Sequence, residues 1–171
     1  NPGDGSIEAA REAAPAVTVV ESGGNVGFAG GCNRGAAASD SELLLFLNND
    51  TEVVEPRWLS QMVGWQRLPG VGSVGALLYY PNDLVQHAGI THRLLYNVLP
   101  APSFKLVPKG QRGYQDYLSL ARESAAQTAA CLLTPSSVFR AHGMFDETDF
   151  GVAYNDCDYG FKLAQSGLRN V

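Results

Sequence analysis

A run of five apolar residues, Leu43 to Leu47, is followed at once by Asn48, Asn49, Asp50 and Thr51. A segment that is apolar on both faces is typical of a buried central strand in a sheet that helices cover on both sides. In such sheets, ligands bind beyond the carboxyl ends of the strands. The segment therefore predicts a central strand and, directly after it, short polar side chains that meet a ligand.

The rest of the 171-residue chain alternates between helical and extended patterns. This alternation predicts one α/β domain over residues 1–171, with a mostly parallel central sheet covered by helices on both faces. Three prolines and weak periodicity indicate a long loop or insert over 95–120. Helices are expected over 7–14, 33–39, 56–68, 135–141 and 156–166, and strands over 17–20, 43–47, 71–80, 84–90 and 128–133.

Charge and cysteine content exclude several classes of function. Twelve Lys and Arg against 17 Asp and Glu give a net charge of -5, so nucleic acid is not an expected partner. No apolar stretch approaches the roughly 20 residues that a membrane-spanning helix needs. The three cysteines form neither a disulfide framework nor a CxxC zinc pair. We therefore expect a reducing, cytoplasmic location.

Asp50 is the candidate metal ligand. A hard divalent cation such as Mg²⁺ binds carboxylate and diphosphate oxygens and keeps several waters, so one well-placed Asp is enough protein ligand. The alternative is that Asn48, Asn49 and Asp50 are simply turn formers, because these residue types are favoured in turns.

A second acidic site, Asp156 and Asp158, lies at the predicted start of the last helix. Carboxylates near a helix N-terminus are stabilised by free N–H groups and by the helix dipole, so capping is the alternative to function. Capping explains one Asp and not two. Residues two apart do not share a helix face, which allows one carboxylate to face a cleft while the other is structural.

The glycine-rich segment 23–31 is a weak candidate for phosphate binding. It lacks the GxxxxGK[ST] pattern, so the glycines are expected to allow tight turns, with Phe28 buried. Arg34 can reach a phosphate, although a solvated arginine is the common alternative. The three histidines share no spacing typical of metal ligands, and we predict no histidine-based site.

Several short blocks occur in a characteristic order along the chain. They are Asp4-Gly5-Ser6, the segment Asn25 to Gly35, Leu45 to Thr51, Gln86-His87-Ala88-Gly89, Gly143 to Glu147, and Asn155 to Tyr159. In this order and company the blocks resemble the family 2 inverting glycosyltransferases with a GT-A fold, especially their rhamnosyltransferase-like branch. The resemblance implies a Rossmann-like α/β/α sandwich whose first strand is missing from this N-terminally truncated chain.

The resemblance also implies a reaction and a set of roles. A sugar passes from a nucleotide-diphosphate donor, linked to UDP or dTDP, to a glycan or lipid-linked saccharide acceptor in surface polysaccharide or cell-wall synthesis. Asp50 would bind Mg²⁺ or Mn²⁺ at the diphosphate, and Asp156 would accept the proton of the acceptor hydroxyl. The residues implied on the donor side are Asp4, Asn25, Gly27, Asn33, Arg34, Asn48 and Asn49.

Three positions depart from the family pattern: Gly3 and Asn155 stand where relatives carry acidic residues, and Lys162 stands where Arg is common. Together with the missing strand, these departures lead us to expect that the chain alone is inactive. The resemblance implies that the full-length protein acts in the cytoplasm, at the inner face of the cell membrane. Two alternatives stay open at this point. One is a non-catalytic domain that binds a nucleotide or glycan, and the other is a nucleotidyltransferase.

Overall fold

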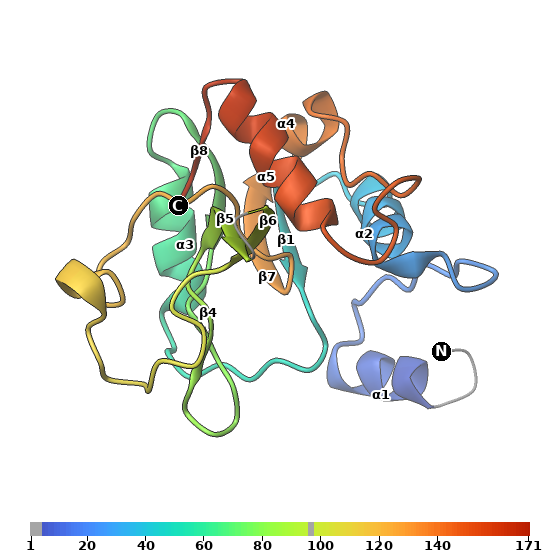
Figure 1. The fold of residues 1–171 in the computed structure, drawn as a ribbon. Coiled ribbons are helices and arrows are strands. Elements are labelled where there is room, and N and C mark those ends of the chain that lie inside the picture. Colours follow the sequence, from blue (N-terminus) through green and yellow to red (C-terminus); the bar gives the residue numbers. More distant parts are fainter. Residues whose placement is uncertain (1–4, 96–97) are drawn as a thin grey trace.

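A computed structural model describes residues 5–95 and 98–171 of the chain. Its main sheet has four strands in the order β1 (Leu43–Leu47), β7 (Cys131–Pro135), β2 (Val71–Gly75) and β8 (Arg169–Asn170). β7 is antiparallel to β1 and to β2, whereas β2 and β8 are parallel. β1, β2 and β8 therefore run in one direction and β7 runs in the other (Figure 1). The sheet is mixed, whereas a mostly parallel one was predicted.

Helices cover both faces of this sheet, as predicted. α2 (Gly27–Ala37), α4 (Ser136–Ala141) and α5 (Asn155–Gln165) pack on one face, and α3 (Trp58–Gln66) packs on the other. Neighbouring strand residues point to opposite faces of a sheet. Leu44 and Phe46 therefore pack in the core on the side of α2, α4 and α5, whereas Leu43 and Leu45 pack on the side of α3. The α/β sandwich is confirmed.

Aromatic rings fill the core beneath α2, α4 and α5. The rings of Phe46, Phe139 and Phe145 lie within 4.9 to 5.1 Å of one another, centroid to centroid, and Tyr159 on α5 joins them edge-on. Tilted and edge-on contacts of this kind add about 0.5–1.5 kcal/mol per pair to the free energy of burial. The tyrosine hydroxyl lies 2.7 Å from Oγ1 of Thr134 on β7, which fixes α5 against the sheet.

Two expectations about strands are wrong. The predicted strand over 17–20 is absent. β-branched residues favour an extended backbone, but a strand also needs a hydrogen-bonded partner. No described strand pairs with this segment. β1 is an edge strand of the described sheet and not a central one, and Leu47 at its end is 48% exposed.

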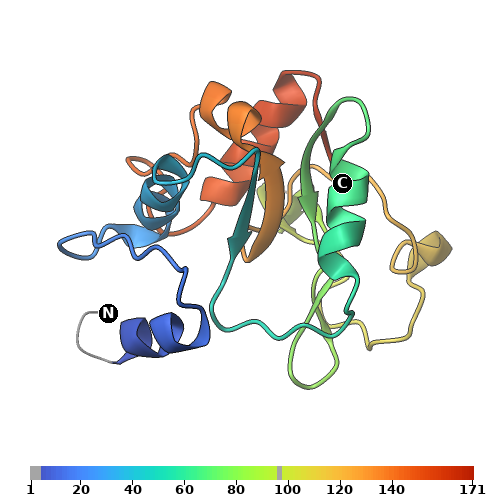
Figure 2. The ribbon, with the colours of Figure 1, turned by 180° about the vertical axis from the view of Figure 1, so that it is seen from behind.

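The predicted first helix is confirmed as α1 (Ser6–Ala13), which stands apart from the sheet in both views (Figures 1 and 2).

The glycine-rich segment also differs from expectation. α2 begins at Gly27, so the glycines after it lie within a helix and not in tight turns. Phe28 is 36% exposed and not buried, because it lies at the start of α2, on the rim of the aromatic core, where its ring is 6.4 Å from that of Phe145.

The remaining strands form two hairpins outside the main sheet. β3 (Leu78–Tyr79) pairs with β4 (Val85–His87), and β5 (Ile90–Leu95) pairs with β6 (Leu99–Pro102). Among its described residues, the expected loop over 95–120 therefore contains β6 near its start and, beyond it, only a 3₁₀ turn, η1 (Tyr114–Asp116). Prolines are tolerated in β6 because a two-stranded ribbon leaves outer N–H positions unpaired. Within the described ranges, no helix is both long and apolar enough to span a membrane.

Candidate active site

One turn, residues 127–130, connects the two acidic segments that the sequence singles out. The N–H of Asn48 donates to the carbonyl of Ala130 at 3.0 Å. The N–H of the preceding residue, Ala129, donates to Oδ2 of Asp156 at 3.2 Å. The turn after β1 and the first turn of α5 are thus fastened to adjacent residues at the same end of the sheet, although more than a hundred positions separate them in the chain.

Asp156 is half-buried in the first turn of α5. Its second oxygen, Oδ1, accepts the N–H of Cys157 at 2.8 Å, one of the donors that a helix start leaves free. Burial, together with the negative charge of Asp156, raises the pKa of the Cys157 thiol to about 12. The thiol is therefore protonated near neutral pH.

The neighbours of Asp156 have structural contacts. Lys162 forms an ion pair with Asp158 one helical turn away, at 2.5 Å. Asn155 is buried, and its amide donates to the carbonyl of Phe150 at 3.0 Å. An ionised glutamate cannot donate such a bond, so the Asn at this position ties the 150s loop to α5 in a way that the family's acidic residue does not.

Asp50 lies in the turn after β1 and is exposed, as is Asn49. The Thr51 hydroxyl donates to the carbonyl of Asn48 at 2.8 Å and closes this turn. Among the described residues, the Asp50 carboxylate has no hydrogen-bond or ion-pair partner, and no three His, Cys, Asp or Glu side chains cluster as a metal cage would require. A single free carboxylate fits a hard cation whose other ligands are diphosphate and water oxygens.

The predicted donor-side residues around α2 hold neighbouring segments in place. Oδ1 of Asn25 accepts the N–H of Gly27 at 3.0 Å. Gly27 has φ +71, and a Cβ there would lie 2.7 Å from the carbonyl oxygen of Gly151, so only glycine fits. That carbonyl also accepts the N–H of Ala29, which places the 150s loop across the start of α2.

Asn33 and Arg34 likewise bind backbone. The buried amide of Asn33 donates to the carbonyl of Phe145 and accepts its N–H, at 2.8 and 3.2 Å. The guanidinium of Arg34 donates to the carbonyl of Ser22 at 2.8 Å. The structure thus brings the turn of Asn48 to Asp50 together with Asp156, and it places Asn25, Gly27, Asn33 and Arg34 on and before α2. Asp4 lies outside the described residues.

His87 on β4 is a residue whose part in this arrangement the sequence reasoning missed. It is 2% exposed, and its Nε2 lies 3.0 Å from Oε1 of Gln127 in the shared turn. Burial lowers the pKa of the imidazole below its ordinary 6.5, while the charge of Asp156 acts in the opposite direction. The sequence signal for His87 was its place in the block Gln86 to Gly89. The search for metal-ligand spacing could not identify it, because this histidine supports a turn and does not belong to a metal-ligand pattern.

Comparison with known proteins identifies the family of the chain. The family model described as "Glycosyl transferase family 2" matches residues 1–126. The protein y4gI of Sinorhizobium fredii is 39% identical over 139 residues, and the O-antigen biosynthesis protein RfbC of Myxococcus xanthus is 37% identical over 140. Each alignment covers 81% of this chain but only 15% and 11%, respectively, of those relatives.

A solved structure supports the fold. The mannosyltransferase PcManGT from Pyrobaculum calidifontis, in complex with GDP-Man and Mn²⁺, superposes with a TM-score of 0.65 at 20% identity. The match covers 98% of this chain and 41% of that protein. With a family model that spans well over half of its residues and a fold that agrees, the chain belongs to glycosyl transferase family 2 and has the GT-A architecture of these glycosyltransferases.

Proposed function

We propose that the chain forms the catalytic domain, or part of it, of an enzyme that transfers a sugar from a nucleotide-diphosphate donor to a glycan or lipid-linked acceptor in surface polysaccharide synthesis. The observation that carries the proposal is the shared turn at 127–130, which holds the Asn48 segment and Asp156 at one end of the sheet. The similarity to a protein of O-antigen biosynthesis supports the polysaccharide product.

Asp156 is the proposed general base. Each of its oxygens accepts one backbone N–H, which fixes the orientation of the carboxylate and leaves further lone pairs for a hydroxyl donor. It accepts the proton of the acceptor hydroxyl while that oxygen attacks the sugar from the face opposite the leaving diphosphate. A single displacement of this kind inverts the anomeric carbon.

Asp50 is the proposed ligand of Mg²⁺ or Mn²⁺. The metal, when bound, neutralises negative charge that develops on the diphosphate as the sugar leaves. A solved GT-A neighbour that holds Mn²⁺ with its nucleotide sugar supports this assignment. The donor side is proposed to include Asp4, Asn25, Gly27, Asn33, Arg34, Asn48 and Asn49.

The donor is proposed to carry UDP or dTDP, with rhamnose as the sugar that the rhamnosyltransferase-like branch suggests. The full-length protein is proposed to act at the cytoplasmic face of the membrane. Because the chain spans a small part of its curated relatives, the donor, the acceptor and the location all concern the protein as a whole.

Calorimetry and a transfer assay on the full-length protein test these roles. UDP, dTDP and GDP are titrated with and without Mn²⁺, and Asp40→Ala and Asp40→Asn serve as controls at an exposed Asp ahead of β1. Asp50→Ala should lose the Mn²⁺-dependent part of nucleotide binding. Asp156→Asn should bind nucleotide normally and transfer no sugar.

Two outcomes would count against the proposal. Normal transfer by Asp156→Asn, at the rate of its Asp40→Asn control, would remove Asp156 as the base. Metal-dependent nucleotide binding without any transfer in the unaltered protein would favour a non-catalytic binding domain.

A further inference from the structure

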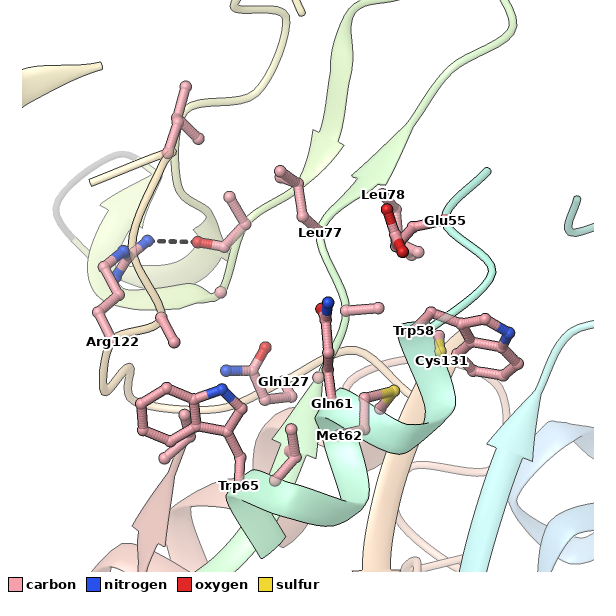
Figure 3. A pocket seen from close by; sticks show the side chains of 18 of the residues that line it. Glu55, Trp58, Gln61, Met62, Trp65, Leu77, Leu78, Arg122, Gln127 and Cys131 are labelled. Carbon is pink, nitrogen blue, oxygen red and sulfur yellow. Dashed lines mark hydrogen bonds between the residues drawn. The ribbon is translucent and has the colours of Figure 1, made fainter. Parts of the chain in front are cut away.

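A cavity of about 380 Å³ lies on the α3 face of the sheet, between α3 and the segment 117–122 (Figure 3). Leu47 and the residues Thr51 to Glu55 form part of its wall, so it adjoins the turn that carries Asp50. α2, with the proposed donor-side residues, packs on the opposite face of the sheet. The cavity is therefore a separate space that opens beside the proposed metal ligand.

Both tryptophans of the chain line this cavity. Trp58 packs against the apolar cluster around Met62, which accounts for it as a core residue. Trp65, about two turns further along the same face of α3, is 42% exposed. An indole left open to solvent in a concave wall offers a flat apolar surface on which a ring can stack.

Two polar side chains line the same cavity as the indole of Trp65. The side-chain amide of Gln61 extends from α3 into the open space below Leu77 (Figure 3). Glu52 also lines the cavity. Among the described residues, neither side chain has a hydrogen-bond partner. The cavity thus offers an aromatic face next to free hydrogen-bonding groups.

Arg122 forms the opposite wall and is held rigidly. Its guanidinium donates to the carbonyl of Ala88 and lies 5.5 Å from the ring centroids of both Phe104 and Tyr117. A wall fixed in this way keeps the cavity open without a ligand, because the guanidinium cannot swing into the space without losing these contacts.

We infer that this cavity is an acceptor subsite that takes a pyranose ring of the acceptor saccharide, with the apolar C–H face of the ring on Trp65 and its hydroxyls toward Gln61 and Glu52. The inference rests on the proposed function. Its volume lies in the lower part of the range of about 300–1,000 Å³ for small-ligand sites, which suits a short saccharide.

The wall of the cavity combines apolar side chains, such as those of Leu77 and Leu120, with the polar side chains of Gln61 and Glu52. An alkyl or polyprenyl chain would match only the apolar part, whereas a sugar ring has an apolar C–H face and hydroxyl edges that match both. Sugar hydroxyls donate to and accept from both groups. Gln127 also lines the cavity, and Ala129, two residues further on, binds Asp156, so the space reaches the turn that positions the proposed base as well as the turn of Asp50.

Tryptophan fluorescence tests the subsite directly, because the chain has only two tryptophans and both line it. The full-length protein, whose other tryptophans are replaced by phenylalanine if it has any, is titrated with the methyl glycosides of mannose, glucose, galactose and rhamnose. At least one should change the emission saturably, and Trp65→Phe should abolish the change. By calorimetry, Gln61→Ala should weaken that binding about three- to tenfold, the value of one neutral hydrogen bond.

Tyr80→Ala is the matched control, since this half-buried tyrosine does not line the cavity. It should bind the glycoside normally. The inference is overturned if none of the four glycosides changes the emission, if calorimetry shows that Trp65→Ala binds as well as the unaltered protein, or if octyl glucoside binds and methyl glucoside, with the other methyl glycosides, does not.

Titration of UDP, dTDP and GDP with Mn²⁺ in the same preparations separates this inference from the proposed function. Nucleotide binding and transfer that persist while every methyl glycoside fails would overturn the subsite alone. Glycoside binding at Trp65 in a protein that neither binds nucleotide nor transfers sugar would overturn the proposed reaction, and with it the acceptor role of the cavity.

Discussion

His87 and Gln127 are in hydrogen-bond contact within the protein interior, with 3.0 Å between the imidazole Nε2 and the carboxamide Oε1. The N–H of the next residue, Thr128, lies 3.4 Å from the same imidazole nitrogen. Ala129, the residue after Thr128, donates its N–H to the carboxylate of Asp156. His87 therefore braces the segment on which the proposed base depends.

Replacing His87 by Ala should lower both stability and transfer. The change leaves the buried Gln127 oxygen without its partner, which costs about 1–3 kcal/mol of the free energy of unfolding. Urea denaturation measures this loss, and Asp40→Ala, at an exposed residue ahead of β1, is the control. Transfer should fall more than nucleotide binding does, since the turn positions Asp156. A variant with unchanged stability and rate would show that the contact is dispensable.

The pH dependence of stability should carry a signature of His87. Burial holds its pKa below 6.5 in the folded protein, so the unfolded chain binds this proton first as the pH falls. The contribution of His87 to the free energy of unfolding should therefore be fully present above about pH 6.5. It should be lost progressively as the pH falls from there to the lowered pKa of the folded protein. In His87→Gln this part of the profile should flatten. Urea titrations at closely spaced pH values measure it, and an identical slope in both proteins would rule out His87 as the cause.

The hydroxyls of Thr134 and Tyr159 should be energetically coupled. Thr134 donates to the carbonyl of Gly72 at 2.8 Å, so the tyrosine donates to Thr134. Tyr159→Phe removes one donor and should cost about 0.5–1.5 kcal/mol. Thr134→Val leaves a buried donor and a buried acceptor unpaired and should cost more, about 1–3 kcal/mol per group. Chemical denaturation of both single variants and of the double variant should give a loss for the pair smaller than the sum. Strict additivity would mean that the two hydroxyls do not interact.

Two helix glycines should respond to alanine with opposite signs. A Cβ at Gly160 in α5 would lie 2.4 Å from the Cβ of Ala126, so Gly160→Ala should destabilise the protein by about 1–3 kcal/mol and displace the helix that carries Asp156. A Cβ at Gly64 in α3 meets nothing within 4 Å, so Gly64→Ala should stabilise it by roughly 0.5–1 kcal/mol. Thermal denaturation compares the pair. Equal shifts of the melting temperature would refute the packing argument.

Local patterns predicted those parts of the fold that local forces decide. The bounds of β1 over Leu43–Leu47 match the apolar run, and α5 begins within one residue of the expected start. The segment 17–20 has the same β-branched signal as a strand but no partner, and pairing depends on distant parts of the chain. The position of β1 at the edge of the described sheet, and its direction against β7, are likewise set by long-range contacts.

The candidate site shows the same division. Short polar residues after an apolar strand, and carboxylates at a helix start, indicated Asp50 and Asp156 from the sequence. The two residues of the shared turn that bind these segments, Ala129 and Ala130, act through backbone groups and carry no sequence signal. The block Gln86 to Gly89 marks His87 in the sequence, but its contact with Gln127 cannot be predicted there, because it depends on β4 lying beside that turn.

In the described structure, β1 pairs with β7 along one side only. Its other side presents backbone amides and carbonyls along five apolar residues that include neither a charge nor a proline, and a flat strand of this kind recruits any extended peptide that can complete its ladder. Purified on its own, the 171-residue chain should therefore self-associate as its concentration rises, and handling it in isolation will require an added peptide or a solubilising substitution.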